Sequence, residues 1–160
     1  MPIDPDTFRS VLGRFATGVT VITTRGDDGL DYGMTASAFS SLSLDPPLVL
    51  VCIAHDASMF PVISTATHFT VNVLAAEQEA LSRRFAAKDP NRFDGVGYTR
   101  GKFGPALLDE ALAYLECRTA HQLESGDHTI FIGEVEAASA APGAAKPLLY
   151  YRGGYAQLER

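Results

Sequence analysis

Residues 33–52 constrain the fold of this 160-residue chain more than any other stretch of its sequence. The stretch begins with small and hydroxyl-bearing residues, turns at Asp45-Pro46-Pro47, and ends in an uninterrupted apolar run. Small side chains let a ligand approach the backbone closely, and hydroxyl groups both donate and accept hydrogen bonds. An apolar run without alternation is typical of a strand that is buried on both faces. The stretch therefore predicts a polar surface on a rigid buried strand, where a planar polar ligand can bind.

Short runs of β-branched and apolar residues, separated by glycine and proline, make up most of the remaining chain. Apolar residues at helical spacing follow Asp4-Pro5-Asp6 and predict a first helix that ends at Gly18. Residues 19–24 are all β-branched, and the Gly/Asp-rich turn after them predicts a hairpin with a second strand at 31–37. We expect further helices from Ser58 and over 77–87, further strands at 48–54, 68–74, 112–123, 129–137 and 148–158, and a loop at 138–145. This pattern predicts a mainly β fold with three brief helices, an antiparallel barrel that is closed or partly closed.

The composition argues against several classes of partner. The net charge of −6 disfavours nucleic acid and anionic membranes as main partners, because phosphate groups favour a basic surface. No apolar segment approaches the roughly 18 residues that span a bilayer, and the first residues lack the features of a signal peptide. We therefore expect a cytoplasmic protein with one domain over residues 1–160.

Cysteine and histidine usage favours a protein without metal or disulfide. Cys52 and Cys117 are far apart and lie in apolar runs, which favours two buried thiols over a disulfide or redox pair. The four histidines show no i, i+4 pair and no Cys-x-x-Cys partner, so no metal site is expected. The motifs of serine hydrolases, P-loop proteins and dinucleotide-binding βαβ units are also missing. Redox chemistry would therefore depend on an organic cofactor.

The segment after residue 54 predicts an anion site. Ser58 is a candidate N-cap, and Pro61 fits the first turn of the helix that follows. Free amides and the helix dipole favour a negative charge where a strand leads into a helix. An ordinary capped surface helix is the alternative interpretation.

Four segments together resemble the flavin reductase family with the FMN-binding split-barrel fold. They are residues 15–23, the stretch 33–52, the Gly-Asp-His at 126–128, and the run Pro-Leu-Leu-Tyr-Tyr-Arg-Gly-Gly-Tyr at 147–155. The resemblance covers nearly the whole chain and implies a Greek-key, antiparallel split β-barrel that forms a homodimer. It also implies an NAD(P)H-dependent flavin reductase. Such an enzyme transfers a hydride from NADH or NADPH to FMN or FAD and supplies reduced flavin to a partner monooxygenase.

The resemblance further assigns roles to individual residues. His128 would bind and orient the nicotinamide, although a polar turn residue without a role is the alternative. Arg92 would contact the flavin, although a lone arginine is often simply solvated, and Tyr150 is expected to pack in the core. The isoalloxazine ring and ribityl chain would be lined by Gly33, Met34, Thr35, Ala36, Ser37, Ser40 and Ser41. The remaining contacts implied are Ala54, His55, Ser58, Met59 and Phe60 at the phosphate, Phe85 with Arg92 at the flavin, and Tyr151, Arg152 and Gly153 on the nicotinamide side.

Two other functions remain open at this point. One is a non-enzymatic flavin-binding or flavin-sensing protein of the same fold; loss of the Gly-Asp-His or the closing Tyr-Tyr-Arg-Gly-Gly would favour it, and both are present. The other is an enzyme similar to pyridoxine-phosphate oxidase, which would need a basic cluster that this acidic chain does not display. The choices between FMN and FAD and between NADH and NADPH stay open. No dense arginine cluster in the sequence marks a site for a 2′-phosphate.

Overall fold

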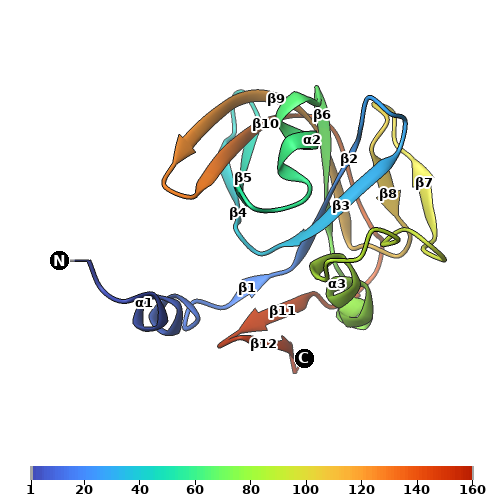
Figure 1. Cartoon of the computed structure of the whole chain (residues 1–160). Coiled ribbons are helices and arrows are strands. Elements are labelled where there is room, and N and C mark those ends of the chain that lie inside the picture. Colours follow the sequence, from blue (N-terminus) through green and yellow to red (C-terminus); the bar gives the residue numbers. More distant parts are fainter. Residues whose placement is uncertain (1, 160) are drawn as a thin grey trace.

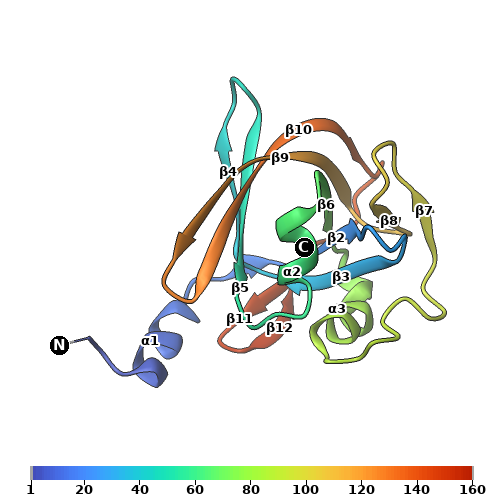
Figure 2. The same ribbon diagram turned by 45° about the horizontal axis from the view of Figure 1, so that its top comes forward.

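The computed structural model describes residues 2–159 and is dominated by one antiparallel sheet of seven strands, in the order β3-β2-β6-β9-β10-β5-β4. Figures 1 and 2 show that this sheet curls, so that its two ends approach each other around the short helix α2 (Phe60–Thr65). The strands are β2 (Thr20–Arg25), β3 (Asp31–Ala36), β4 (Phe39–Ser43), β5 (Leu48–Ala54), β6 (His68–Val73), β9 (Ala113–Ser125) and β10 (His128–Ala140).

Two smaller sheets and three further helical segments complete the structure. The three-stranded sheet β1-β11-β12 lies beneath the curled sheet in Figure 1, next to α3, whereas α1 extends from the body on the far side of β1. The smaller strands are β1 (Thr17–Gly18), β7 (Tyr98–Arg100), β8 (Ala106–Leu108), β11 (Leu148–Tyr151) and β12 (Gly154–Gln157). The helical segments are α1 (Pro5–Leu12), the 3₁₀ turn η1 (Ala76–Gln78) and α3 (Glu79–Ala86).

The predicted elements are present, but several boundaries differ. The first helix ends at Leu12 rather than Gly18, and residues 17–18 instead form β1 against β11. The predicted strand 148–158 is a hairpin, because the chain reverses at a two-residue turn between Tyr151 and Gly154. Strand β10 continues to Ala140, into the predicted loop, and the serine-rich run after residue 38 forms β4, an edge strand that was not predicted.

Strand β5 was predicted to be buried on both faces, and this prediction was wrong. Its residues alternate between buried and half-buried, with Val49, Val51 and Ile53 on the buried face. The curled sheet surrounds a core on one side only, so the opposite face of β5 keeps partial contact with solvent. A purely apolar composition therefore did not distinguish full burial from burial of one face.

Two apolar clusters hold the helices to the sheet. The first contains Met59, the N-cap of α2, and Ile63 within that helix, which pack with Phe69 and Phe131 of the central strands. The second contains Phe85 of α3, packed with residues of β2, β8 and β11. Phe85 and Met59 are almost completely buried, with exposed fractions of 0% and 1%. The two clusters thus fix α3 and the start of α2 on separate parts of the same sheet.

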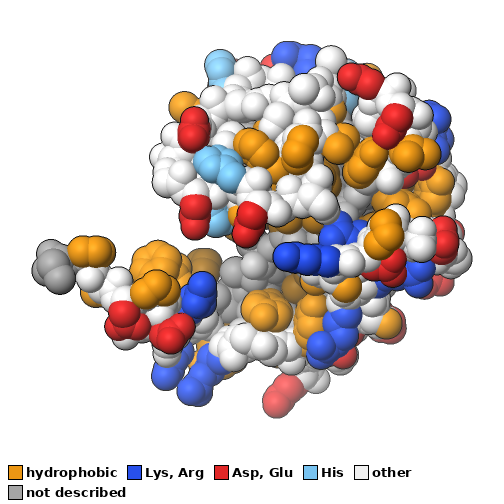
Figure 3. Space-filling view, viewed as in Figure 1, with side chains coloured by type: hydrophobic (Ala, Val, Ile, Leu, Met, Phe, Trp, Pro, Cys, Tyr) orange, Lys and Arg blue, Asp and Glu red, His pale blue; other side chains and the backbone are white. Residues whose placement is uncertain are grey.

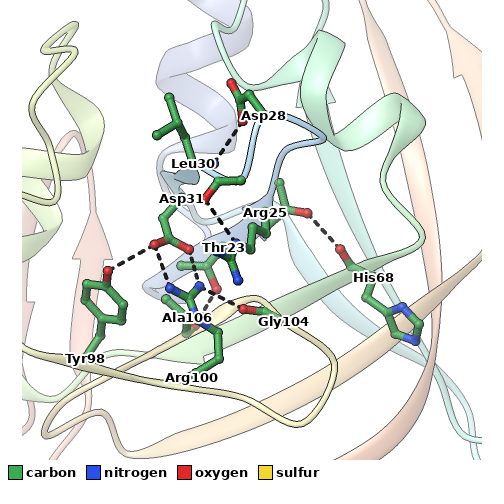
Figure 4. Close-up of polar contacts among 12 residues, drawn as sticks. Thr23, Arg25, Asp28, Leu30, Asp31, His68, Tyr98, Arg100, Gly104 and Ala106 are labelled. Atoms are coloured by element: carbon green, nitrogen blue, oxygen red, sulfur yellow. Dashed lines mark hydrogen bonds and ion pairs between the residues drawn. The ribbon is translucent and has the colours of Figure 1, made fainter.

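Buried polar contacts attach the β7–β8 hairpin to this body. The fully buried Asn72 donates from Nδ2 to the Val21 carbonyl at 3.0 Å and accepts from the Leu108 amide at 2.9 Å. Asp31 accepts from the Tyr98 hydroxyl at 3.0 Å and pairs with Arg100, as Figure 4 shows. This pairing with Asp31 raises the pKa of Arg100 above its ordinary value.

Both cysteines are free; Cys117 is buried as predicted, but Cys52, also predicted to be buried, is only half-buried because it lies on the outer face of β5. Burial raises the pKa of both thiols, that of Cys117 to about 12. Within residues 2–159, no group of three or more histidine, cysteine or carboxylate side chains is arranged to hold a metal ion. None of the described helices has the length and apolar character that crossing a membrane requires.

Candidate functional site

A cleft of about 530 Å³ opens between β3, the segment that connects β5 to α2, and the region of α3 and the loop after it. Three stretches of chain that are distant in sequence contribute to its walls. Its lining includes six of the residues predicted to contact the flavin: Met34, Thr35, Ser58, Met59, Phe85 and Arg92. The other lining residues are Asp56, Ala57, Ala86, Lys88, Asp89 and Pro90.

The walls of this cleft fit a planar aromatic ring that carries an anionic group. The half-buried Met34 and the buried Met59 and Phe85 form an apolar part of the wall, while Lys88 and Arg92 supply positive charge and Ser58 a hydroxyl. Asp56 and Asp89 also lie on the lining, so the cleft is not uniformly cationic. Its volume falls within the roughly 300–1,000 Å³ typical of small-molecule sites. The residues present therefore fit a flavin mononucleotide moiety.

Gly33 does not line the cleft; it is buried where β3 packs against Phe85 of α3. A Cβ atom at this position would lie 2.8 Å from Cε1 of Phe85 and 3.3 Å from Cζ of Phe93. The Gly33 carbonyl accepts a hydrogen bond of 2.8 Å from Nη1 of Arg92. The missing side chain thus allows α3 to pack against β3, and Gly33 shapes the cleft through Phe85 and Arg92.

Arg92 is anchored by the backbone around it. Its Nε donates to the Ala87 carbonyl at 2.8 Å, in addition to the bond from Nη1 to Gly33. Arg84 reinforces the same loop, because its Nε donates to the Arg92 carbonyl at 2.7 Å and its Nη2 to the Asn91 carbonyl at 3.1 Å. Arg92 is therefore not simply a solvated arginine. Arg84 was not predicted as a site residue, since nothing local distinguishes it from other helical arginines.

Hydrogen bonds connect the β3 wall of the cleft to α3 and β12. The Thr35 hydroxyl donates to the Ser82 carbonyl at 2.6 Å. The fully buried Ser82 side chain is in turn hydrogen-bonded to the Tyr155 hydroxyl at 2.7 Å. The side chain of Thr35 thus connects β3 to α3 at the wall of the cleft.

Ser58 is not the N-cap of α2, contrary to prediction. The N-cap is Met59, in a helical backbone conformation and without a side-chain capping bond. The chain first makes a turn, in which the Ala57 amide donates to Ala54 and the Phe60 amide donates to Ala57. Ser58 is therefore an exposed residue on the rim of the cleft. Pro61 occupies the first turn of α2, as predicted.

His128 lies at the start of β10, directly opposite Ala54 of β5. Its Nδ1 is 2.6 Å from Oδ1 of Asp127, and this hydrogen bond is the main cause that lowers the pKa of Asp127. The Asp127 carbonyl accepts from the His55 amide at 2.9 Å, and Nε2 of His55 is 3.0 Å from the Thr129 hydroxyl. The Gly-Asp-His turn and the segment 54–60 are thus directly connected, although His128 is not among the residues that line the cleft.

The other predicted contact residues lie around the cleft rather than on its lining. Ala36 is buried, Ala54, His55 and Phe60 are half-buried at the side of His128, and Ser37, Ser40 and Ser41 are exposed on and beside β4. Tyr151, Arg152 and Gly153 form the exposed end of the β11–β12 hairpin. Tyr150, predicted to pack, is 36% exposed and contacts Tyr155 edge-to-face.

Comparisons with known proteins agree with this architecture. Residues 12–159 match the model of the flavin reductase like domain. The chain is 42% identical over 158 residues to the flavin-dependent monooxygenase reductase subunit HsaB of Mycobacterium tuberculosis, covering 98% of this chain and 84% of that protein. It is 45% identical over 157 residues to the flavin reductase (NADH) of Kitasatospora aureofaciens, covering 97% and 82%.

Solved structures give the same result. The NADH:FAD oxidoreductase SgcE6 of Streptomyces globisporus, solved with NAD and FAD fragments, superposes with a TM-score of 0.91 at 41% identity and covers 99% of this chain and 96% of that one. Nitrilotriacetate monooxygenase component B from Mycobacterium thermoresistibile superposes with a TM-score of 0.93 at 38% identity, covering 96% and 86%. These matches confirm the predicted mainly β, antiparallel flavin reductase fold. On sequence and structure together, the chain belongs to the flavin reductase-like domain family.

Proposed function

We propose that this chain is an NADH-dependent flavin reductase that transfers a hydride to FMN or FAD and supplies reduced flavin to a separate monooxygenase. One observation carries the proposal: Met34, Thr35, Ser58, Phe85 and Arg92, each assigned to the flavin by resemblance, meet in one cleft. The relatives named flavin reductase (NADH) and reductase subunit support the same electron donor and the same two-component arrangement. NADPH remains the alternative donor.

The proposed flavin site uses the apolar and the polar parts of the cleft separately. The ring system lies against the apolar part of the cleft, where Met34 is half-buried and Met59 and Phe85 are buried, and the backbone of residues 34–37 meets its polar edge. Ser58, Lys88 and Arg92 hold the phosphate by hydrogen bonding and charge. The bound flavin supplies the hydride-accepting chemistry that the side chains lack.

His128 binds and orients the nicotinamide in this proposal. Its Asp127 partner fixes the orientation of the imidazole ring through the 2.6 Å contact at Nδ1. The side chain is 45% exposed, which leaves Nε2 accessible to a second substrate. Hydride transfer needs no protein acid, so the role of His128 is to hold the donor carbon within about 3–3.5 Å of its acceptor.

We also propose that the chain acts as a homodimer in the cytoplasm, where its nucleotide donor is found. Helix α1 has no buried residue although Phe8, Val11 and Leu12 are apolar and between 53% and 60% exposed. Exposed apolar surfaces of this kind are usually covered by a partner.

The decisive experiment measures oxidation of NADH by the purified chain with FMN and FAD in separate runs, for the wild type and His128→Ala. We expect turnover above the rate without enzyme, and a higher KM for NADH in the variant. Unchanged kinetics in the variant would remove His128 from the site while leaving the reductase. Absence of wild-type turnover with either nucleotide would favour the non-enzymatic flavin-binding protein.

A further inference from the structure

His55 is the residue at which the segment between β5 and α2 meets the Gly-Asp-His turn. Its backbone amide donates to the carbonyl of Asp127 at 2.9 Å. Its side chain reaches the other flank of His128, because Nε2 of His55 lies 3.0 Å from the hydroxyl of Thr129. One residue therefore bonds to both sequence neighbours of His128.

The side chain of His55 does not face the candidate flavin cleft. The resemblance placed His55 among the phosphate contacts, but the part of this segment that lines the cleft begins at Asp56. His55 instead lines a separate cavity of about 400 Å³, whose other lining residues are Phe60, Gln122, Glu124 and Thr129. The imidazole of His55 thus faces the β9–β10 hairpin, which carries His128, rather than the proposed phosphate site.

The imidazole of His55 and its partner Thr129 are both held in place. The ring of Phe60 lies 4.9 Å from the imidazole between centroids, and Phe60 in turn contacts the fully buried Phe131 of β10. Thr129 is only 5% exposed, so water competes little for its hydroxyl. A buried hydroxyl that loses its partner destabilises the structure. The contact between His55 and Thr129 therefore joins two side chains whose positions are already fixed by packing.

The turn itself holds His128 weakly. Ser125, Gly126 and Asp127 are exposed, and Gly126 has a φ of 62°. Within residues 2–159, the imidazole of His128 is hydrogen-bonded to Asp127 alone, whose side chain is 95% exposed. Exposed hairpin ends with few packed contacts open readily. A defined orientation of the His128 ring therefore depends on a backbone that is fixed on either side of it.

Charged groups also link His55 to this turn. Figure 3 shows histidine side chains among carboxylates at the left of the upper body, over the β9–β10 hairpin. Glu124 lines the cavity of His55, and Asp127 lies in the turn between β9 and β10. The pKa of Asp127 is lowered mainly by its hydrogen bond with His128, and the charge of His55 adds to this lowering. His55 thus acts on the turn through space as well as through hydrogen bonds.

We propose that His55 is a positioning residue for the nicotinamide, because it holds the backbone on both sides of His128 without touching either substrate. This inference rests on the proposed function, which assigns His128 to the nicotinamide. It replaces the phosphate contact that the resemblance gave to His55. The side-chain bond to Thr129 is the part of this arrangement that substitution can remove, since the backbone bond to Asp127 is kept by every residue except proline.

The test uses four variants of the full chain. His55→Leu removes the hydrogen bond but keeps apolar contact with Phe60, whereas His55→Gln keeps a polar group near the place of Nε2. Thr129→Val removes the partner hydroxyl and keeps a β-branched side chain in the strand. Thr70→Val is the matched control, because the fully buried Thr70 hydroxyl has no hydrogen-bond partner among the described residues. A double variant, His55→Leu with Thr129→Val, completes a mutant cycle.

The KM for NADH, kcat with FMN as acceptor, and the dissociation constant of FMN are measured for each variant. His55→Leu and Thr129→Val should each raise the KM for NADH about fivefold, the factor that loss of one hydrogen bond implies. The value of kcat and FMN binding should stay within about twofold of the wild type. His55→Gln should restore the KM, and the double variant should match the single ones, because all of them remove the same bond. Thr70→Val should keep wild-type kinetics.

In an active enzyme these KM values decide the proposal. It is overturned if His55→Leu keeps the wild-type KM for NADH, or if the two single effects add in the double variant. Weaker FMN binding in His55→Leu, in parallel with the KM, would also overturn it and return His55 to the phosphate site.

A second readout separates this proposal from the proposed function. Carboxyl NMR titration of Asp127 needs no turnover, and Thr129→Val keeps the charges of His55 and His128. If the wild type shows no reductase activity, the proposed function fails and this titration decides the role of His55. A rise in the pKa of Asp127 in Thr129→Val would show that the contact positions the turn, and an unchanged pKa would overturn that role. Wild-type turnover with an unchanged KM in the variants removes only the role of His55.

Discussion

The Cα atom of Gly33 lies against the ring of Phe85, and a Cβ atom at Gly33 would lie 2.8 Å from Cε1 of that ring. Phe85 is completely buried and cannot withdraw without disturbing the cluster that holds α3. This contact therefore sets the separation between two walls of the candidate flavin cleft.

Gly33→Ala should push α3 away from β3 and lower the free energy of unfolding by about 1–3 kcal/mol, the usual cost of overpacking. FMN binding should weaken in parallel, because the cleft changes shape. Urea denaturation and a flavin titration measure the two effects. Gly18→Ala is the control, since no atom lies within 4 Å of a Cβ built there; an equal loss in both variants would contradict the packing argument.

Arg92→Lys keeps the positive charge but should not restore the hydrogen bonds that Arg92 makes. The guanidinium group reaches the carbonyls of Ala87 and Gly33 at once, whereas an ammonium group lacks this planar fork. We expect faster amide hydrogen exchange in residues 87–94 and a loss of about 1–2 kcal/mol in FMN binding. Arg118→Lys, far from the cleft in an exposed ion pair with Glu134, should change neither quantity. Wild-type exchange in Arg92→Lys would show that the loop does not depend on these bonds.

Arg152→Asn should stabilise the fold, because Arg152 has a φ of 52° in the turn of the β11–β12 hairpin. A left-handed conformation costs a side chain such as arginine roughly 1–2 kcal/mol, and asparagine tolerates it better. We expect the free energy of unfolding to rise by about 0.5–1 kcal/mol in urea denaturation. Arg14→Asn, outside the turn, provides the comparison. A loss of stability in Arg152→Asn would show that the arginine side chain makes a structural contact that outweighs the turn preference.

His128→Ala should raise the pKa of Asp127 toward its ordinary value of 3.8, because the hydrogen bond from His128 is the largest cause of its lowering. A carboxyl group whose pKa is lowered by folding stabilises the protein above its unfolded pKa. That contribution is lost as the pH falls through the lowered native pKa. Carboxyl NMR titration of the wild type and the variant measures the change directly. Identical titration curves would mean that the 2.6 Å contact does not persist in solution.

Cys117 should resist alkylation in the native protein at mildly alkaline pH, because burial raises its pKa to about 12. Cys52 is half-buried and should react first. The unfolded chain ionises at the ordinary thiol pKa of 9.0. The native state therefore loses stability as the pH rises above that value. Mass spectrometry after timed alkylation at increasing urea concentration gives the order of reaction, and equal rates for both thiols would contradict it.

The sequence by itself determined most of the elements, although not the strands β1, β4, β7 and β8. β-branched runs such as residues 19–24, the Gly-Asp turn before His128 and the helical apolar spacing after Asp4 record local backbone preferences, which act within a few residues. The resemblance, carried by contiguous motifs, was sufficient to identify the family. It was also sufficient to nominate six of the twelve residues that line the cleft.

Only the tertiary structure decided how those residues are used. Because the chain turns before α2, Ser58 lies on the rim of the cleft and does not cap the helix. Gly33 is needed because a side chain there would clash with Phe85. Arg9, Arg14 and Arg152 converge because β1 pairs with β11, a contact between the two ends of the chain. Such contacts depend on long-range packing and on which carbonyl or cavity a side chain meets in space. Local patterning does not encode that information, so most elements could be predicted from the sequence but their convergence could not.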